Sequence, residues 1–568
     1  METRRLLVVP FVLLLLGVGV VVAFSAVGMS PATIEPTAAE RPGEAAESPD
    51  AAAEELAWME GVDLESDPIG CIGEICHDDE LGIDQSDGLT DEEFELLVQQ
   101  SMARVEYLRE QRFKEPVPVE LMTREEYRER VADDDEPTDE QRAFDRWNDQ
   151  VWQALWIVDG ETSANAEIDR TFGTAVVGFY SSANEQITLV VDDDEQPAIR
   201  DTTLIHELGH AMQDQYHDLG DSRYRGATQD EDLAIDGIVE GEVVYVETQY
   251  EERCQTGEWE CASPPASGGG GGDTNFGIFL TIFQPYSDGP GYAHDIVEAD
   301  GWDGVADRMD DPPVSTTQVI HRTDREPRSI EFDDEATDGW ETYSDQGVDG
   351  AETVGEASIY AMFYYQSREY DAGAIDWREL NNESHPYETY NYVSEPSDGW
   401  AGDELYPYRR GDDEDGYVWV TEWRTPADAI EFAEAYDAIL NAHGAERTDR
   451  GIEIVEDGGY SGAYGVHVED TRVTVVYGPT EAAIGELRPS VADSLAADEG
   501  HRKADDSSVV DDDGDDQTGD DTEADGDGTD DTDREDAVSD TVDVVPGFTP
   551  AAAVIAISTV LLWLGRRN

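Results

Sequence analysis

Apolar side chains recur at helical spacing in several parts of the chain. In residues 79–113 they return every three to five positions, and so share one face of a helix: Phe94, Leu97, Met102, Val105 and Leu108. The same periodicity predicts helices in residues 144–158, 203–219, 230–253 and 425–440. For the helix at 203–219, the sequence offers Asp201, Thr202 or Thr203 as the N-cap.

Two stretches alternate between apolar and polar positions, as paired strands do. Residues 174–194 are typical of a strand, a polar turn at 181–185 and a second strand ending in Ile-Thr-Leu-Val-Val. Residues 463–478 are typical of a hairpin. The chain has no internal repeat, and its helices and hairpins lack the strand–helix–strand rhythm of a parallel sheet. The pattern predicts an α+β fold.

Both ends of the chain carry apolar segments. Arg4 and Arg5 precede an apolar run in residues 6–24, which is typical of a secretory signal, of twin-arginine type, or of an uncleaved membrane anchor. At the other end an apolar segment precedes Arg566 and Arg567, which favours a cytoplasmic end. We therefore expect the chain between these segments to be exported and to face outward.

The C-terminal segment opens with Pro546, Gly547 and Phe548 and closes with the arginine pair. It resembles the PGF-type sorting signal of surface proteins in halophilic archaea, which implies recognition by an archaeosortase, removal of the tail and attachment of a lipid. A plain transmembrane tail anchor is the alternative. Just upstream, residues 511–536 are rich in Asp, Gly and Thr, cannot bury a core and are expected to form an extended stalk.

These segments divide the 568 residues into five parts. We expect a signal peptide or N-terminal anchor (1–30), an Ala-, Glu- and Pro-rich linker (31–66), a folded ectodomain (67–500), an acidic stalk (501–543), and the sorting signal with its membrane segment (544–568). The ectodomain is long enough to bury a large core.

The charge of the chain excludes one class of partner and indicates an environment. The formal net charge is −98, and Lys114 and Lys503 are the only lysines. Acidic residues occur throughout the chain between its two ends, which indicates a surface adapted to high salt, where screening removes the repulsion between like charges. Nucleic acid is excluded as a partner, because the chain offers no basic footprint for a phosphate backbone.

The four cysteines lie in two close pairs, Cys71 with Cys76 and Cys254 with Cys261. An even number of cysteines in an exported chain favours disulfides, and each pair would close a small loop. A zinc site that combines them with His77 is the competing interpretation, but their spacings do not match the usual two-residue knuckle. Pairing across the two clusters is the other alternative.

The helix predicted at 203–219 contains His206, Glu207 and His210, an HExxH motif. Residues four apart lie one above the other on a helix, so both imidazoles can bind a single Zn²⁺. Glu207 lies about 100° round the helix from His206, where it can reach a metal-bound water as a general base. The motif predicts a zinc site that does chemistry; two polar-face histidines without a metal are the alternative.

The third zinc ligand is expected from a later helix. The metzincin pattern fails, because Gln213 and Tyr216 stand where that pattern needs Gly and His, and His217 arrives one residue late. The gluzincin pattern instead takes a Glu from a later helix. Residues 238–247 offer three: Glu240, Glu242 and Glu247.

Glu240 is the favoured ligand of these three. Gly241 follows it, and a glycine there would let a neighbouring helix approach closely. Spacing alone does not separate the candidates further. Asp236, one turn before Glu240, is a candidate to orient a ligand histidine, with plain surface charge as the alternative.

Several stretches resemble a known family. GFYSSANEQITLVV (178–191), the motif helix and IVEGEVVYVE (238–247) are similar to a group of secreted gluzincin-like zinc metallopeptidases of bacteria and archaea. PPVSTTQVIHR (312–322) and GWAGDELYPY (399–408) resemble later elements of that family, so the similarity covers about residues 90–480. The resemblance implies His206, His210 and Glu240 as the zinc ligands. Val243 and His217 depart from the family pattern, which leaves the role of His217 open.

The resemblance also singles out His321. Zinc peptidases of this type need a donor for the oxyanion that forms when water attacks the carbonyl, and we expect His321 to supply it. A surface histidine, or one that only supports other residues, is the alternative.

Together these patterns predict a cell-surface zinc metallopeptidase that hydrolyses peptide or protein substrates, with Glu207 as general base. The strand ending in Ile-Thr-Leu-Val-Val is expected to bind the substrate by strand addition. The alternative is a non-catalytic binding or adhesion protein with a structural zinc site, which would have no need of Glu207.

Overall fold

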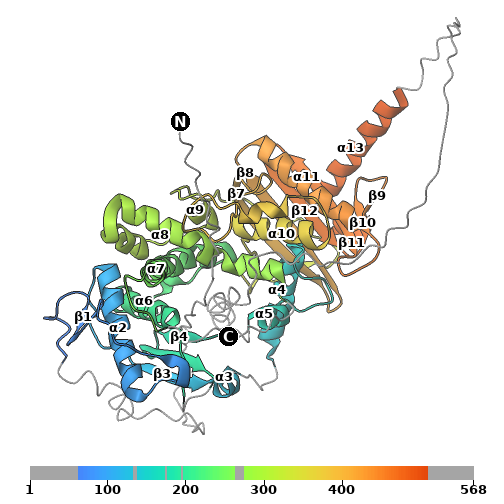
Figure 1. Ribbon diagram of the computed structural model, residues 1–568. Helices are drawn as coiled ribbons and strands as arrows, with labels where there is room; N and C mark the ends of the chain where they lie inside the picture. The colour runs from blue at the N-terminus through green and yellow to red at the C-terminus, as the bar shows by residue number, and fades with distance from the viewer. Residues whose placement is uncertain (1–61, 132–136, 173–175, 193–195, 263–273, 509–568) are drawn as a thin grey trace, which may run out of the picture.

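The computed structural model describes residues 62–131, 137–172, 176–192, 196–262 and 274–508 (Figure 1). Within these ranges the chain mixes helices with two larger sheets and a small hairpin, which confirms the α+β prediction. No helix in the described part of the chain is long and apolar enough to cross a membrane. The predicted signal or anchor and the sorting signal lie outside the described residues.

The C-terminal half contains a seven-stranded antiparallel sheet with the order β6–β7–β8–β12–β11–β10–β9. Two hairpins form its centre: β7 (Trp400–Arg410) with β8 (Glu414–Trp423), and β11 (Gly462–Glu469) with β12 (Arg472–Gly478). The second hairpin confirms the prediction for residues 463–478. The outer strands are short: β6 (Glu341–Thr342), β9 (Glu446–Arg447) and β10 (Glu453–Val455).

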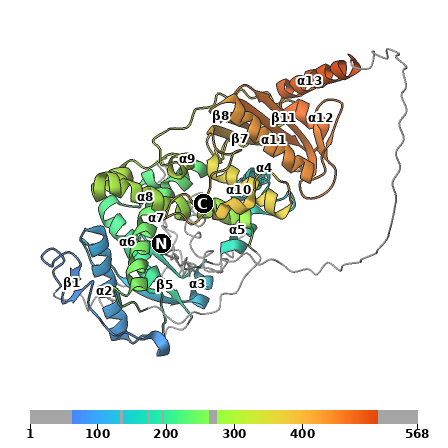
Figure 2. The same cartoon turned by 45° about the horizontal axis from the view of Figure 1, so that its top comes forward.

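Alternation along β8 explains why helices cover both faces of this sheet (Figure 2). Tyr417 and Trp419 belong to the hydrophobic cluster shared with α4, α10 and α11, whereas Val418 and Val420 belong to the cluster shared with α12 and α13. Successive side chains of a strand point to opposite faces, so both faces are apolar and need cover. The helices are α4 (Asp139–Ala154), α10 (Gly355–Glu369), α11 (Pro426–Ala442), α12 (Glu481–Leu487) and α13 (Pro489–Ser508).

A smaller sheet has the order β3–β5–β4. Strands β4 (Gly178–Ser181) and β5 (Gln186–Val191) form the antiparallel hairpin predicted from the alternation. The other neighbour of β5 is β3 (Val119–Thr123), which runs parallel to it and was not predicted. The crossover that a parallel pair requires contains α4 together with α3 (Arg124–Val131) and α5 (Ala164–Phe172).

The motif helix α6 and the following helix α7 lie between the two sheets (Figures 1 and 2). The predicted helices at the N-terminus and at the motif are confirmed as α2 (Asp91–Arg109) and α6 (Asp201–His217), and the helix at 230–253 as α7 (Gln229–Thr256). The pattern did not predict α8 (Phe276–Asp310) or the short α9 (Thr316–Ile320). Helix α8 contains two prolines and bends at Gly301, whose φ is 72°.

The predicted N-cap of α6 was wrong. The N-cap position is Arg200, without a side-chain cap, and Asp201 is already the first helical residue. The Asp201 carboxylate instead accepts hydrogen bonds from Tyr250 Oη (2.6 Å) and Ala262 N (3.0 Å). The Asp201 side chain, which the local pattern predicted as a helix cap, therefore binds residues from distant parts of the chain instead.

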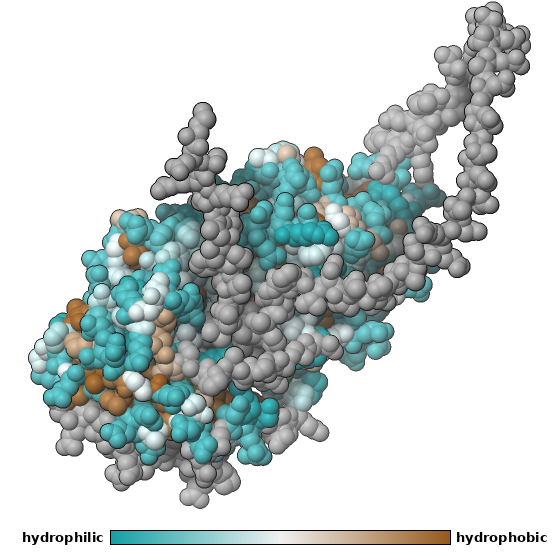
Figure 3. All heavy atoms as spheres, viewed as in Figure 1, coloured by the Kyte–Doolittle hydropathy of each residue, from teal (hydrophilic) through white to brown (hydrophobic). Residues whose placement is uncertain are grey.

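Both predicted disulfides are present. Cys71–Cys76 closes the two-residue strands β1 (Cys71–Ile72) and β2 (Ile75–Cys76), and Cys254–Cys261 closes the end of α7. None of the four cysteines is left free for a metal site with His77. The surface face in Figure 3 is mainly hydrophilic, as the acidic composition leads one to expect.

Candidate metal centre

Helix α6 carries both motif histidines into the protein interior. His206 and His210 are fully buried, as is Glu207 between them. The helix is held by apolar side chains on its other faces, which join a cluster with α2 and the small sheet: Leu204, Ile205, Leu208, Ala211 and Met212. The amphipathic arrangement therefore fixes the direction in which the two imidazoles point.

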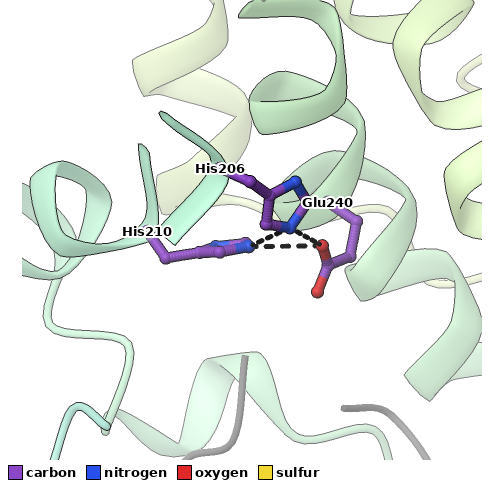
Figure 4. A group of neighbouring side chains, drawn as sticks. All are labelled: His206, His210 and Glu240. Atoms are coloured by element: carbon purple, nitrogen blue, oxygen red, sulfur yellow. Dashed lines mark hydrogen bonds and ion pairs between the residues drawn. The ribbon is translucent and has the colours of Figure 1, made fainter. Parts of the chain in front are cut away.

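Helix α7 brings Glu240 to these histidines (Figure 4). Glu240 Oε2 lies 3.2 Å from His206 Nε2 and 3.3 Å from His210 Nε2, and the two nitrogens are 3.0 Å apart. Zinc bonds of about 2.0–2.1 Å in a tetrahedron separate the ligand atoms by about 3.3 Å. The three atoms therefore fit a small divalent cation, and the expected trio is brought together.

Two close helix contacts set this geometry. A Cβ on Gly209 of α6 would lie 2.9 Å from Val243 of α7, and a Cβ on Gly241 would lie 2.4 Å from the backbone of Gly289 of α8. Because Gly241 has no side chain, α8 can pack directly on α7 beside Glu240, as predicted. Val243, which departs from the family pattern, occupies the space that Gly209 leaves open.

The second ring nitrogen of each histidine faces a polar side chain. His206 Nδ1 lies 3.2 Å from Glu247 Oε2, and His210 Nδ1 lies 2.9 Å from Gln213 Oε1. An acceptor opposite Nδ1 requires the proton on Nδ1 and leaves the lone pair of Nε2 for a cation. The Gln213 oxygen thus holds His210 in the tautomer that a metal ligand needs, and Glu247 favours the same tautomer of His206 when its oxygen accepts from Nδ1.

The electrostatics favour a neutral His206 and an ionised Glu240. Burial, together with the neighbouring His210, lowers the pKa of His206 to about 4. Burial works against ionisation of Glu240, but the two histidines outweigh it and lower the pKa of this carboxyl to about 2. A neutral imidazole and an ionised carboxylate are the forms that bind metal. Burial and nearby acids, among them Glu251 and Glu207, raise the pKa of Glu247 well above its usual range.

The expectation that β5 binds the substrate by strand addition was wrong. Strand β5 is the central strand of its sheet, paired on one side with β3 and on the other with β4, so it has no free edge. Among the described residues, β4 pairs only with β5. Tyr180 of β4 donates a hydrogen bond from its Oη to Asp214 Oδ2 of α6 (2.7 Å), which ties β4 to the motif helix.

His321 lies just past the end of α9 and is paired with a buried acid. Its Nε2 is 2.7 Å from Glu356 Oε1 of α10 and 4.0 Å from Asp398 Oδ1. Burial alone would lower the pKa of His321, but Glu356 outweighs it and raises that pKa. Val319 packs against Gly237 of α7, which places α9 beside the part of α7 that leads to Glu240.

Two other candidates from the sequence have different surroundings. His217, at the end of α6, has its Nδ1 3.4 Å from Asp310 Oδ1 at the end of α8, so it belongs to a helix-end contact rather than to the trio. Asp236 is buried on α7, but the carboxylate that faces His206 Nδ1 is Glu247. Glu247 is seven residues after Glu240, and this two-turn spacing was the available signal for it.

The Gly-Trp-Ala-Gly-Asp stretch has a structural role that the sequence did not reveal. Asp403 accepts hydrogen bonds from the backbone N–H groups of Val354 (3.1 Å) and Gly355 (3.0 Å), at the start of α10. It also accepts from the indole nitrogens of Trp400 (3.1 Å) and Trp419 (3.0 Å). This buried carboxylate joins the seven-stranded sheet to the helix that carries Glu356.

A sequence-family model described as a domain of unknown function (DUF8575) matches residues 341–488. This range corresponds to the seven-stranded sheet with α10, α11 and α12, and does not contain the His206–His210–Glu240 trio. No curated protein and no solved structure matches this chain.

Proposed function

We propose that this protein is a zinc-dependent metallopeptidase held at the cell surface. The observation that carries the proposal is the trio itself: three ligand atoms lie 3.0–3.3 Å apart, with both Nδ1 atoms turned to polar side chains and away from the trio. A set of two imidazoles and one carboxylate suits zinc. Three protein ligands are the number found in catalytic zinc sites, which keep a fourth position open, whereas structural sites are closed by four.

Zinc bound here would supply Lewis acidity, polarising the scissile carbonyl and lowering the pKa of water. Glu207 is next to His206 on α6 and is buried. Its carboxylate would accept a proton from the attacking water, whose oxygen bonds to the carbonyl carbon. It would pass that proton to the amine nitrogen as the C–N bond breaks.

The substrate chain would lie along β4, one of the two strands of the small sheet, with β3, that pair on one side only within the described residues. An extended peptide there would gain main-chain hydrogen bonds, with side-chain specificity from alternate positions. The Tyr180–Asp214 hydrogen bond holds β4 against the helix that carries His206 and His210, which supports this position.

His321 would donate to the oxyanion that forms on the carbonyl oxygen. Its pairing with the buried Glu356, which raises its pKa, favours the protonated imidazole that such a donor needs. The contact of α9 with α7 supports a place for His321 on the same side of α7 as Glu240.

Export is supported by the two disulfides, which form and persist in oxidising compartments. We propose anchoring through the C-terminus, with an archaeosortase that recognises the signal at Pro546-Gly547-Phe548, removal of the tail and attachment of a lipid. Mass spectrometry of the mature protein tests this. Intact peptides reaching Leu564 in most molecules would leave a simple transmembrane anchor.

The test of the enzymatic proposal is Glu207→Gln, assayed on casein and a peptide library at high salt. Loss of a general base typically lowers the rate by about 10²- to 10⁴-fold, while zinc content should stay unchanged because no ligand is altered. Glu106→Gln is the control, since Glu106 is equally buried but lies on α2, bonded to Gly70 N and Phe113 N.

The enzymatic proposal fails if Glu207→Gln cleaves peptides as fast as the unaltered protein. If the unaltered protein binds zinc and cleaves nothing across the library, the non-catalytic binding protein becomes the better explanation.

A further inference from the structure

The amide of Gln213 has only one orientation that satisfies its neighbours. Its Nε2 donates to the carbonyl oxygen of Val239 (2.9 Å) and to Glu242 Oε2 (2.9 Å), both of which can only accept. Gln213 Oε1 must therefore face His210, whose Nδ1 is 2.9 Å away. The proton of His210 is consequently on Nδ1, and its Nε2 is free to bind a cation.

One of the two acceptors that orient Gln213, Glu242, belongs to a buried ion pair. Glu242 is 2% exposed and pairs with Arg109, which is 5% exposed at the end of α2. The guanidinium carbon of Arg109 lies 4.1 Å from the centroid of the Trp302 ring of α8. Glu242 thus presents a carboxylate, which has no hydrogen to offer, to the amide nitrogen of Gln213.

Burying a carboxylate without a partner is costly in free energy. Arg109 offsets this cost and so allows the Glu242 carboxylate to be buried beside Gln213. An amide at position 242 could donate a hydrogen to Gln213, so that only the carbonyl oxygen of Val239 would still oppose the flipped amide. The flipped amide would turn an N–H group toward His210 and favour the wrong tautomer for metal binding. The ion pair therefore adds to the carbonyl oxygen of Val239 a second acceptor that opposes the flipped amide.

We infer that Arg109 and Glu242 are positioning residues for the metal centre, acting through Gln213 on His210. This inference rests on the proposed metal site and deepens it. The three acids of residues 238–247 then have separate roles, with Glu240 as the ligand, Glu247 facing His206 Nδ1, and Glu242 fixing the tautomer of His210. Neither Arg109 nor Glu242 contacts any of the three ligand atoms; Gln213 stands between them and His210.

The test is the zinc affinity of Glu242→Gln in the full-length protein, measured by competition with a chromophoric chelator at high salt. Removing the support of a metal ligand typically weakens binding by about 10- to 100-fold, and we expect a loss in that range. The visible absorption of Co²⁺ in the same site should also change in energy or intensity, because Gln213 would hold His210 less firmly with one acceptor altered. A purely structural role would leave this spectrum unaltered.

Glu453→Gln is the matched control, because Glu453 also pairs with an arginine (Arg447, 2.7 Å) and is mostly buried, but in β10 of the seven-stranded sheet, next to the edge strand β9. It should keep the zinc affinity and the Co²⁺ spectrum of the unaltered protein. If Glu242→Gln does not fold, Gln213→Met takes its place, since Met fills similar space but cannot accept from His210 Nδ1 as an amide oxygen does.

The outcomes separate this inference from the function on which it rests. If the unaltered protein binds zinc and folded Glu242→Gln, or Gln213→Met in its place, binds it equally well, the positioning role is overturned. The metal centre itself would then stand. An unaltered protein that binds no zinc would overturn both. Weaker zinc binding and an altered Co²⁺ spectrum in Glu242→Gln would support the positioning role, provided that Glu453→Gln shows neither change.

Discussion

Gly241 of α7 lies directly against Gly289 of α8, so that a Cβ at position 241 would be 2.4 Å from the carbonyl carbon of Gly289 and 2.5 Å from its oxygen. Real Cβ atoms do not come this close to a backbone, and a backbone cannot move aside as a flexible side chain can. Gly241 is also the residue after Glu240, the third proposed ligand. The crossing of α7 and α8 therefore fixes where the Glu240 carboxylate lies.

Gly241→Ala should destabilise the protein by about 1–3 kcal/mol, the usual cost of overpacking. It should also weaken zinc binding, because separation of the helices moves Glu240. Thermal melting at matched salt and metal content after dialysis measure the two effects.

Gly485→Ala is the control for the glycine change. Gly485 is also helical, in α12, but a Cβ there would meet only Ala492, at 3.9 Å. Alanine should stabilise that position slightly, by about 0.5–1 kcal/mol. Equal stability of the two variants would show that the crossing does not need glycine.

His206→Ala, and separately His210→Ala, should abolish stoichiometric zinc binding, because two ligands alone hold the ion weakly. Elemental analysis of the purified full-length protein decides this. His385→Ala is the control: His385 Nε2 lies 3.4 Å from Asp295 Oδ1, in another His–Asp group, and its loss should leave the zinc in place. If zinc is retained in the double variant at 206 and 210 but is lost in His385→Ala, the metal site is at His385.

His321→Ala should lower kcat by about 10²- to 10³-fold, the range for removing one oxyanion donor, with zinc retained. His443→Ala is the matched control, since His443 is also partly buried and paired, with its Nε2 2.7 Å from Gln366 Oε1. If both variants keep full activity, the His321–Glu356 pair is a structural ion pair and the oxyanion donor lies elsewhere.

The pH dependence of stability should change on replacing Asp230. Burial raises the pKa of this carboxyl from 3.8 to about 7, despite hydrogen bonds from Thr316 N and Oγ1. Between these values the folded protein holds a proton that the unfolded chain releases. The contribution of Asp230 to the free energy of unfolding is therefore full below pH 3.8 and falls as the pH rises toward 7.

Asp230→Asn keeps an acceptor oxygen for Thr316 but cannot ionise. The contribution of residue 230 to the free energy of unfolding therefore does not fall as the pH rises. Its melting temperature relative to the unaltered protein should rise between about pH 4 and pH 7 and level off at higher pH. The exposed Asp412, in the turn between β7 and β8, gives the control Asp412→Asn for the loss of one acidic residue. Parallel melting curves for the unaltered protein and Asp230→Asn would mean that Asp230 does not titrate in this window.

Local patterns were enough for some of the site. The HExxH motif lies within one helix, where spacing of four residues alone brings His206 above His210. The disulfide pairs were also predictable, because cysteines five and seven residues apart close loops at little entropic cost. The α6 and α7 helices and the β4–β5 and β11–β12 hairpins follow from periodicity in the same way.

Contacts between distant segments decided the rest. Strand β5 became central because β3, far upstream, pairs parallel to it, and alternation within β5 carries no information about that partner. The choice of Glu240 as ligand and Glu247 as the partner of His206 depends on which face of α7 meets α6. Packing of Gly241 on Gly289 and of Val243 on Gly209 fixes that face. The sequence by itself determined which groups could bind a metal, and the packing of α6, α7 and α8 decided which of them meet, because side-chain type is local whereas helix orientation results from contacts across the whole core.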